Sequence, residues 1–319
     1  MKKSIWFLAL VIISNYASAQ AYNFRDYVET SDIDNFWIAY DSIKKLEKPA
    51  QKKAVFKSIY LDRASTGLKS LAFEREMAAD SWLWTIETFP AFWNSVRPNT
   101  QNLHKDFRKL EKVYRNFQKI YSGFRPTITY YVIGNMTNGG TVINGKAIIG
   151  AELAASNRKT NASELTSSYR DRMRLNKGIV FITAHELVHT QQNLHKKRAS
   201  NLLGMALKEG SADFIAELLT GRKVEAPYMA YGRKNECGLW QQFQGEMHGS
   251  DYRKWISNSS NSDGLPSDLG YFIGYAITRQ YYRKARNKEE AIAEILRLDF
   301  SDRNATNRFL EGSEYRPCR

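Results

Sequence analysis

Residues 178–195 read GIVFITAHELVHTQQNLH, the most informative stretch of this sequence. Its apolar residues predict a buried helix, on which side chains four residues apart lie above one another. His185 and His189 therefore leave the same face and can bind one metal ion, with Glu186 beside them. Two neutral imidazoles, an open position for water and a carboxylate that takes the water's proton make a hydrolytic zinc site. The stretch thus predicts Zn²⁺ as cofactor, with Glu186 as the catalytic base.

A catalytic zinc usually has a third protein ligand from a neighbouring element. The next helical segment, NLLGMALKEGSADFIAELLTG, is expected to stop at Gly221 and supplies Glu209, with nineteen residues between His189 and Glu209. Asp213 follows four residues later on the same helical face. Because a metal-bound histidine normally donates its other N–H to a carboxylate, we expect Asp213 to orient one of the two histidines.

His195 is the alternative third ligand. It lies ten residues after His185, where metzincins place their third histidine after a glycine-containing turn. No glycine occurs between the two histidines, and Gln192 occupies the turn position. Without glycine the helix is expected to continue, which would rotate His195 off the metal face.

The spacing resembles that of the gluzincin metallopeptidases, of which thermolysin is the best-known. The resemblance implies that His185, His189 and Glu209 are zinc ligands, that Glu186 is the general base and that Asp213 supports a histidine. It also implies a small β-sheet before the zinc helix, with an edge strand that pairs with the substrate backbone. Residues 147–150 are the candidates for that edge strand by this resemblance, and an ordinary structural hairpin is the alternative.

The first 19 residues read as a cleaved signal peptide. Lys2 and Lys3 precede the apolar run 5–13, and residues 17–19, Ala-Ser-Ala, form a small-x-small cleavage site. No cysteine stands at that boundary, so we expect no lipobox, and no later apolar run is long enough to span a membrane. The sequence therefore predicts an exported protein, periplasmic or secreted.

Composition predicts a folded protein, since 43% of residues are hydrophobic and 13% aromatic. The net charge is +14, and +12 remains once the two signal-peptide lysines are removed. An anionic envelope surface is therefore a candidate partner beside a peptide or protein substrate, whereas export argues against nucleic acid. The two cysteines, Cys237 and Cys318, can form one disulfide in an oxidising compartment, although two cysteines alone do not decide this.

The remaining pattern predicts a mostly helical α+β fold. Residues 20–125 read as an N-terminal helical subdomain, beginning with a capped helix from Ser31. One face of that helix is apolar, and a later aromatic group is a further candidate for the core. The apolar face has Ile33, Phe36, Trp37, Tyr40 and Ile43, and the aromatic group is Trp82, Trp84, Phe89, Phe92 and Trp93. A helix near residues 103–121 has a strongly basic side, which is expected to be solvated, with a docking surface as the alternative. Residues 126–319 form the predicted zinc domain, in which strands 126–150 surround the turn Asn144-Gly145 and precede the zinc helix.

The segment DLGYFIGYAITRQYY, residues 268–282, carries two of the three candidate donors for a developing oxyanion, and the third, His248, precedes it. Tyr271 is the first choice, Tyr275 the second and His248 the third. Gly270 and Gly274 lie on another side of the same helix and would permit close helix packing.

A wider resemblance covers most of the mature chain. The segments SDIDNFWIAYD, IGNMTNGGT, AHELVHTQQ, LKEGSADFIAELLTG and DLGYFIGY are similar to those of a bacterial family of predicted zinc-dependent proteases. That family is related to gliding-motility-associated lipoproteins of the Bacteroidota. We therefore expect an exported zinc metallopeptidase with a gluzincin-like core. The alternative is a non-catalytic envelope or gliding-machinery protein in which zinc only stabilises the fold.

Overall fold

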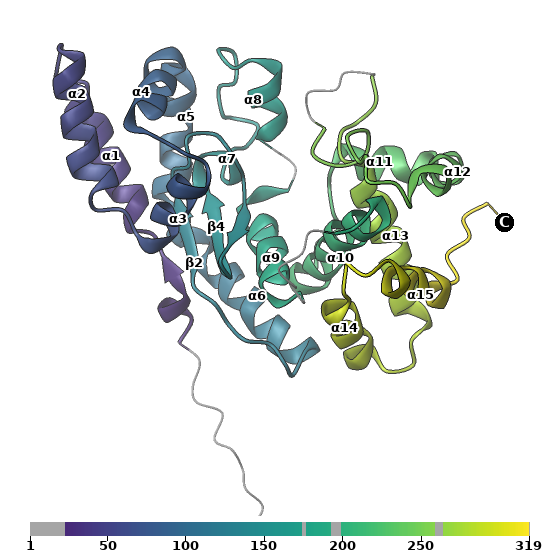
Figure 1. The fold of residues 1–319 in the computed structure, drawn as a ribbon. Coiled ribbons are helices and arrows are strands. Elements are labelled where there is room, and N and C mark those ends of the chain that lie inside the picture. Colours follow the sequence, from purple (N-terminus) through teal and green to yellow (C-terminus); the bar gives the residue numbers. More distant parts are fainter. Residues whose placement is uncertain (1–22, 174–176, 193–198, 259–263, 319) are drawn as a thin grey trace, which may run out of the picture.

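The structure is a computed structural model that describes residues 23–173, 177–192, 199–258 and 264–318. A small sheet lies in the middle of the molecule, with α1 to α5 on one side and α9, α10 and α13 on the other (Figure 1). The helices are α1 (Ser31–Ile43), α2 (Pro49–Phe56), α3 (Thr66–Glu74), α4 (Ala79–Thr88), α5 (Pro90–Gln101), α6 (Phe107–Ile120), α7 (Ala151–Ala154), α8 (Ser167–Arg172), α9 (Gly178–Gln191), α10 (Leu202–Thr220), α11 (Pro227–Lys234), α12 (Glu236–Glu246), α13 (Leu269–Lys284), α14 (Lys288–Arg297) and α15 (Arg303–Ser313). Shorter helical turns are η1 (Phe24–Tyr27), η2 (Lys57–Leu61) and η3 (Leu103–Asp106). The predicted class, a mostly helical α+β protein with a small sheet, is confirmed.

The sheet has four strands in the order β1-β2-β4-β3. They are β1 (Val28–Glu29), β2 (Thr129–Val132), β3 (Thr141–Ile143) and β4 (Lys146–Gly150), of which β1, β2 and β4 are parallel and β3 is antiparallel to β4. Asn144 and Gly145, both with positive φ, join β3 to β4 in the tight hairpin that their sequence predicts. The strand β1, from the predicted N-terminal subdomain, pairs with β2, from the predicted zinc domain. The predicted domain boundary at residues 125 and 126 therefore stays a prediction.

The expectation that residues 147–150 form the edge strand is wrong. They belong to β4, which pairs with β2 on one side and β3 on the other. Ala147, Ile148 and Ile149 are almost completely buried, as suits an interior strand, whereas Thr141 and Val142 of β3 are partly exposed. The edge beside the zinc helix is therefore β3.

Aromatic side chains form much of the N-terminal core. In α1, the apolar face predicted from the sequence is buried: Ile33, Phe36, Trp37, Tyr40 and Ile43. The helix begins at Ser31 as expected, although its first N–H donates to the Glu29 carboxylate rather than to a hydroxyl cap. Four of the five aromatic residues predicted for the core of α4 and α5 are buried (Trp82, Phe89, Phe92, Trp93), while Trp84 is exposed.

Close packing between α10 and α13 positions the second half of the site. A Cβ on Gly274 would lie 1.7 Å from the Ala206 carbonyl oxygen, and one on Gly210 would lie 2.1 Å from the Tyr275 nitrogen. Only glycine permits this backbone contact, so the expected packing role is confirmed for Gly274. The helix α10 ends where predicted, because Gly221 adopts the left-handed conformation that stops a helix.

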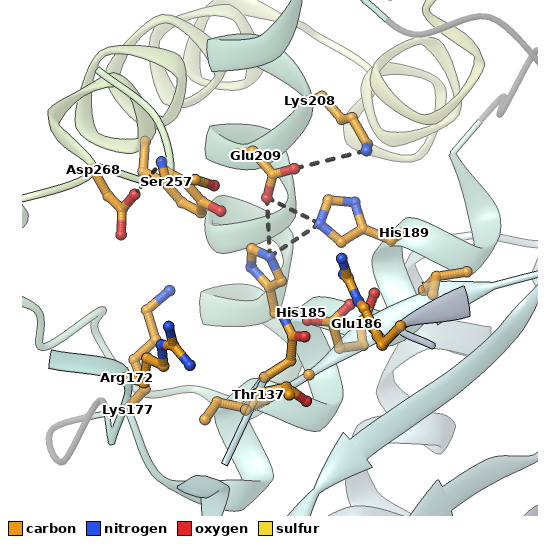
Figure 2. A pocket seen from close by; sticks show the side chains of 18 residues that line it. Thr137, Arg172, Lys177, His185, Glu186, His189, Lys208, Glu209, Ser257 and Asp268 are labelled. Atoms are coloured by element: carbon orange, nitrogen blue, oxygen red, sulfur yellow. Dashed lines mark hydrogen bonds and ion pairs between the residues drawn. The ribbon is translucent and has the colours of Figure 1, made fainter. Parts of the chain in front are cut away.

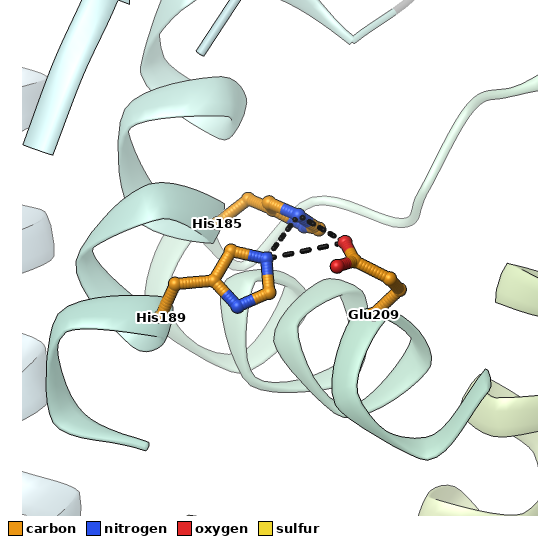
Figure 3. Close-up of side chains that lie close together, drawn as sticks. All are labelled: His185, His189 and Glu209. Atoms are coloured by element: carbon orange, nitrogen blue, oxygen red, sulfur yellow. Dashed lines mark hydrogen bonds and ion pairs between the residues drawn. The ribbon is translucent and has the colours of Figure 1, made fainter. Parts of the chain in front are cut away.

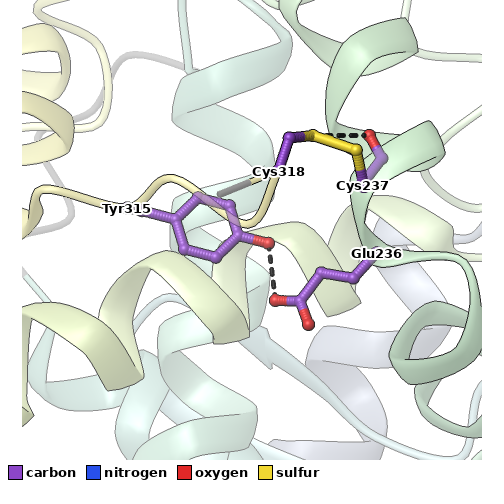
Figure 4. The surroundings of a disulfide bond; sticks show 4 residues. All are labelled: Glu236, Cys237, Tyr315 and Cys318. Atoms are coloured by element: carbon purple, nitrogen blue, oxygen red, sulfur yellow. Dashed lines mark hydrogen bonds between the residues drawn. A yellow bond between two sulfur atoms is a disulfide. The ribbon is translucent and has the colours of Figure 1, made fainter.

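A disulfide holds the C-terminal end of the chain. Cys237 at the start of α12 is bonded to Cys318, which confirms the expected pair, and the Tyr315 hydroxyl donates to Glu236 at 2.8 Å (Figure 4). Burial and the neighbouring Glu236 carboxylate raise the pKa of Tyr315, so that this hydroxyl stays a donor. Within the described part of the chain, no helix has both the length and the apolarity to cross a bilayer.

Candidate metal centre

The helix α9 places His185, Glu186 and His189. Every residue from Ile179 to His189 is buried, because α9 packs between the sheet and α10. The two imidazole rings lie one turn apart with centroids separated by 4.6 Å. Their Nε2 atoms are 3.0 Å apart and face the same point.

The third group comes from α10. The Oε2 atom of Glu209 lies 3.2 Å from His189 Nε2 and 3.5 Å from His185 Nε2 (Figure 3). Three ligands of one tetrahedral zinc ion at about 2.1 Å stand about 3.4 Å from one another. The three separations here are close to that value, so His185, His189 and Glu209 form a group that could hold one metal ion. Two imidazoles and a carboxylate suit zinc, although the same donors also bind other divalent transition metals.

The orientation of His185 is fixed from behind by Asp213. Its Nδ1 atom lies 2.8 Å from Asp213 Oδ1, so Nδ1 carries the proton and Nε2 keeps its lone pair for a metal. Asp213 is fully buried and also accepts hydrogen bonds from Lys177 Nζ, at 2.9 Å, and from the Tyr228 hydroxyl. Burial alone would raise the pKa of Asp213, but the Lys177 charge and these hydrogen bonds hold it well below its usual value.

Lys177 was not predicted from the sequence as part of the site. Its side chain is only 6% exposed and lies over the rings of Phe181, Tyr228 and Tyr271. The only signal in the sequence is its position one residue before an apolar helix. The partner that holds it, Asp213, is 36 residues away, and only folding brings the two together.

The orientation of His189 is fixed by Gln192, which the sequence analysis also missed. His189 Nδ1 lies 2.7 Å from Gln192 Oε1, while Gln192 Nε2 donates to the Lys208 carbonyl at 2.8 Å and to Ser211 Oγ at 3.0 Å. The Lys208 carbonyl can only accept a hydrogen bond, so the atom of Gln192 that faces it must be the amide nitrogen. The Gln192 oxygen, Oε1, then faces His189 Nδ1 and accepts its proton. His189 Nε2 thus also keeps its lone pair for a metal.

The expected continuation of the zinc helix is wrong. The helix ends at Gln191, and Gln192 is extended, with φ −61° and ψ 144°. No glycine is needed, because the φ of Gln192 is negative and two hydrogen bonds of its side chain, to the Lys208 carbonyl and Ser211 Oγ, tie the chain to α10 at that point. His195 lies outside the described residues, so its role as an alternative ligand stays a prediction.

The electrostatics of the centre favour a positive charge. Burial alone would lower the pKa of His185, but hydrogen bonds with Asp213 and Glu209 outweigh it and raise the pKa to about 9. Burial would raise the pKa of Glu209, yet the two neighbouring histidines hold it well below its usual value. A buried carboxylate that stays ionised between two imidazoles is a suitable environment for a divalent cation.

A cavity of about 440 Å³ lies in front of the three ligands and is lined by Glu186 (Figure 2). Its rim includes the loop from Thr137 to Gly140, the first residues of the edge strand β3, and four basic side chains: Arg75, Arg172, Lys177 and Lys208. A Cβ on Gly140 would lie 2.6 Å from both Cγ and Oε1 of Glu186, so the backbone of this loop passes close to the Glu186 side chain. The cavity leaves the metal ligands accessible from one side.

Of the predicted oxyanion donors, only Tyr271 lines the cavity. Its ring stacks on His185 at 6.1 Å with an interplanar angle of 15°. The Tyr275 hydroxyl instead donates to Glu217 at 3.0 Å, and Tyr275 does not reach the cavity. His248 is exposed beyond the end of α12 and is also not part of the lining. The structure therefore gives no support to a catalytic role for either of these two residues.

Comparison with known proteins gives one result that covers almost the whole chain. Residues 22–317 match the family model described as gliding motility protein GldB. The chain belongs to this family. No curated protein and no solved structure matches it. The gliding-motility part of the resemblance seen in the sequence is thus confirmed.

Membership in the GldB family changes two expectations. The comparisons include no peptidase family and no gluzincin structure, so neither peptidase activity nor a gluzincin fold is shown. GldB is a lipoprotein family, which implies an exported protein held at a membrane. Export agrees with the sequence analysis, whereas the expectation that the protein has no lipobox receives no support from the family.

Proposed function

We propose that this member of the GldB family binds zinc through His185, His189 and Glu209 and uses the centre to hydrolyse peptide bonds. The observation that carries the proposal is the convergence of two Nε2 atoms and one carboxylate oxygen at separations of 3.0 to 3.5 Å. Buried hydrogen bonds hold both histidines in the tautomer that a metal requires. Three protein ligands beside an open cavity are typical of catalytic zinc, because a structural site is closed by four.

The chain's own residues supply the remaining chemistry. When bound, zinc lowers the pKa of water from about 15.7 towards about 7. The Glu186 carboxylate lines the cavity and is 7% exposed, so it can accept the water's proton and pass it to the leaving amine. Tyr271 and Lys177 line the same cavity and can donate hydrogen bonds to the developing oxyanion. The edge strand β3, of which Thr141 and Val142 line the cavity, offers its backbone to an extended peptide.

The metal part of the proposal is tested by elemental analysis of the purified protein and of two variants. Glu209→Ala should lose near-stoichiometric zinc, because it removes one of three ligands. Glu225→Ala, an exposed glutamate outside the centre, should retain it. Equal zinc in both variants would disprove the proposed ligand set.

The catalytic part is tested with a diverse peptide mixture and detection of products by mass spectrometry. The wild-type protein should cleave peptides, and Glu186→Gln should retain zinc but lose cleavage. Gly140→Ala keeps the carboxylate but pushes it aside, because the new methyl group overlaps Glu186. It should therefore lower turnover while leaving zinc bound.

A second candidate is a non-catalytic component of the gliding machinery in which zinc only stabilises the fold. The family match favours it, since the matching description names motility and no enzyme. A zinc-loaded wild-type protein that cleaves no peptide in the mixture, but unfolds at a lower temperature after chelation, would establish this alternative.

A further inference from the structure

The helix α6 presents a continuous basic stripe to solvent. At about 100° per residue, its five basic residues fall within an arc of about 120°. All five are exposed: Arg108, Lys109, Lys112, Arg115 and Lys119. The opposite face is buried in the core through Leu110, Val113, Tyr114 and Phe117. The stripe therefore has a fixed orientation on the surface of the protein.

Acidic residues border the stripe but do not interrupt it. Asp106, just before the helix, pairs with Lys109 at 2.7 Å, and Glu111 lies 3.7 Å from Arg115. The other three basic residues, Arg108, Lys112 and Lys119, form no ion pair with any described residue. They span about 16 Å along the helix at a rise of about 1.5 Å per residue. The centre of the stripe thus carries uncompensated positive charge.

The same helix receives the first described residues of the chain. The ring of Phe24 in η1 packs against Phe107 and Tyr114 of α6, with centroids 6.0 and 5.6 Å away. The guanidinium of Arg25 lies 6.0 Å from the Phe107 ring centroid. Figure 1 shows this purple beginning of the described chain beside α6. The N-terminal end of the described chain therefore lies against the basic helix.

We propose that the α6 stripe docks on a membrane surface rich in anionic phospholipid. A straight row of exposed cations fits a flat surface of laterally mobile negative headgroups. Phe24 and Arg25 pack on this helix, so the stripe lies beside the N-terminal end of the described chain. The membrane association implied by the lipoprotein family agrees with this placement, and the proposal does not depend on the metal centre.

The experiment measures partitioning of the mature protein, residues 20–319, onto vesicles of phosphatidylcholine with and without phosphatidylglycerol. Each basic residue near an anionic membrane contributes about fivefold to binding. The triple variant Arg108→Gln, Lys112→Gln, Lys119→Gln should therefore lose about hundredfold in partitioning. The control variant Lys45→Gln, Lys48→Gln, Lys159→Gln removes the same charge from exposed residues outside α6 and should stay within a few-fold of wild type.

Thermal unfolding of both variants checks that the fold is intact. Binding should disappear on neutral vesicles and weaken steeply as salt rises. The proposal is overturned if the two triple variants bind alike, if neutral vesicles bind as well as anionic ones, or if high salt has no effect. The proposal would also be overturned if the α6 variant lost binding to a DNA oligonucleotide but kept its binding to vesicles. That result would favour a polymeric anion as the partner.

Discussion

Replacing Gln192 by leucine should weaken metal binding without touching a ligand. The substitution removes the acceptor for His189 Nδ1 and leaves the Lys208 carbonyl without its side-chain donor. Loss of a partner that orients a metal-bound histidine typically costs 10–100-fold in metal affinity, or about 1.4 to 2.7 kcal/mol. At about 0.5 to 1.5 kcal/mol each, the three lost hydrogen bonds should also lower the free energy of unfolding by about 1.5 to 4.5 kcal/mol.

Metal affinity is measured by competition with a chromogenic zinc chelator, and stability by thermal unfolding of the metal-free protein. Gln191→Leu is the matched control, because its neighbouring amide also makes several hydrogen bonds, but to Arg125 and Thr190 rather than to a histidine. Gln192→Glu separates the two effects. It restores an acceptor for His189 but cannot donate to the Lys208 carbonyl, so it should bind zinc better than the leucine variant while remaining less stable than wild type.

The reasoning would be refuted if folded Gln192→Leu bound zinc within twofold of Gln191→Leu. In that case the helix alone would orient His189, and the contact with Gln192 would be incidental.

Other changes test the packing, the buried charge and the disulfide. Gly274→Ala should destabilise the protein by about 3 kcal/mol or more in thermal unfolding, because the new Cβ would lie 1.7 Å from the Ala206 carbonyl oxygen. The control Gly238→Ala has open space around its Cβ and should be neutral or slightly stabilising. Burial raises the pKa of Glu152 from 4.5 to about 7, so its contribution to stability is full below about pH 4.5 and is lost as pH rises through about 7. Glu152→Gln should remove about 3 kcal/mol of this pH dependence, which the difference between the two unfolding curves across pH 4 to 8 would reveal. Cys318→Ser should cost about 2 to 5 kcal/mol in denaturant unfolding while leaving the zinc content unchanged.

Local sequence patterns predicted the features that depend on local geometry. The spacing of four residues brings His185 and His189 onto one face of α9, and the same spacing aligns Glu209 and Asp213 on α10. The left-handed Gly221 ends α10 where the sequence predicts. Each of these features depends on backbone periodicity or on the conformational freedom of glycine, both of which are properties of a short segment.

The tertiary structure decided which segments meet. For that reason two expectations from the sequence, on the edge strand and on Tyr275, failed, and two residues of the site, Gln192 and Lys177, were not predicted. The order of the strands puts β3 rather than β4 at the edge, because pairing between distant strands is not encoded in either strand alone. Tyr271 and Tyr275 lie one helical turn apart, and only the start of α13 borders the cavity, so Tyr275 meets Glu217 instead.

The residues that orient and surround the two histidines also differ in whether the sequence could predict them. Asp213 could be recognised because helical spacing ties it to Glu209. Gln192 and Lys177 could not, because each acquires its partners only when α9 packs on α10. The sequence by itself thus determined the histidine pair His185 and His189, since the two repeat with one helix, and it marked Glu209 by its spacing from them. Only the tertiary structure determined what orients and surrounds them, because those contacts join residues that are distant in the chain.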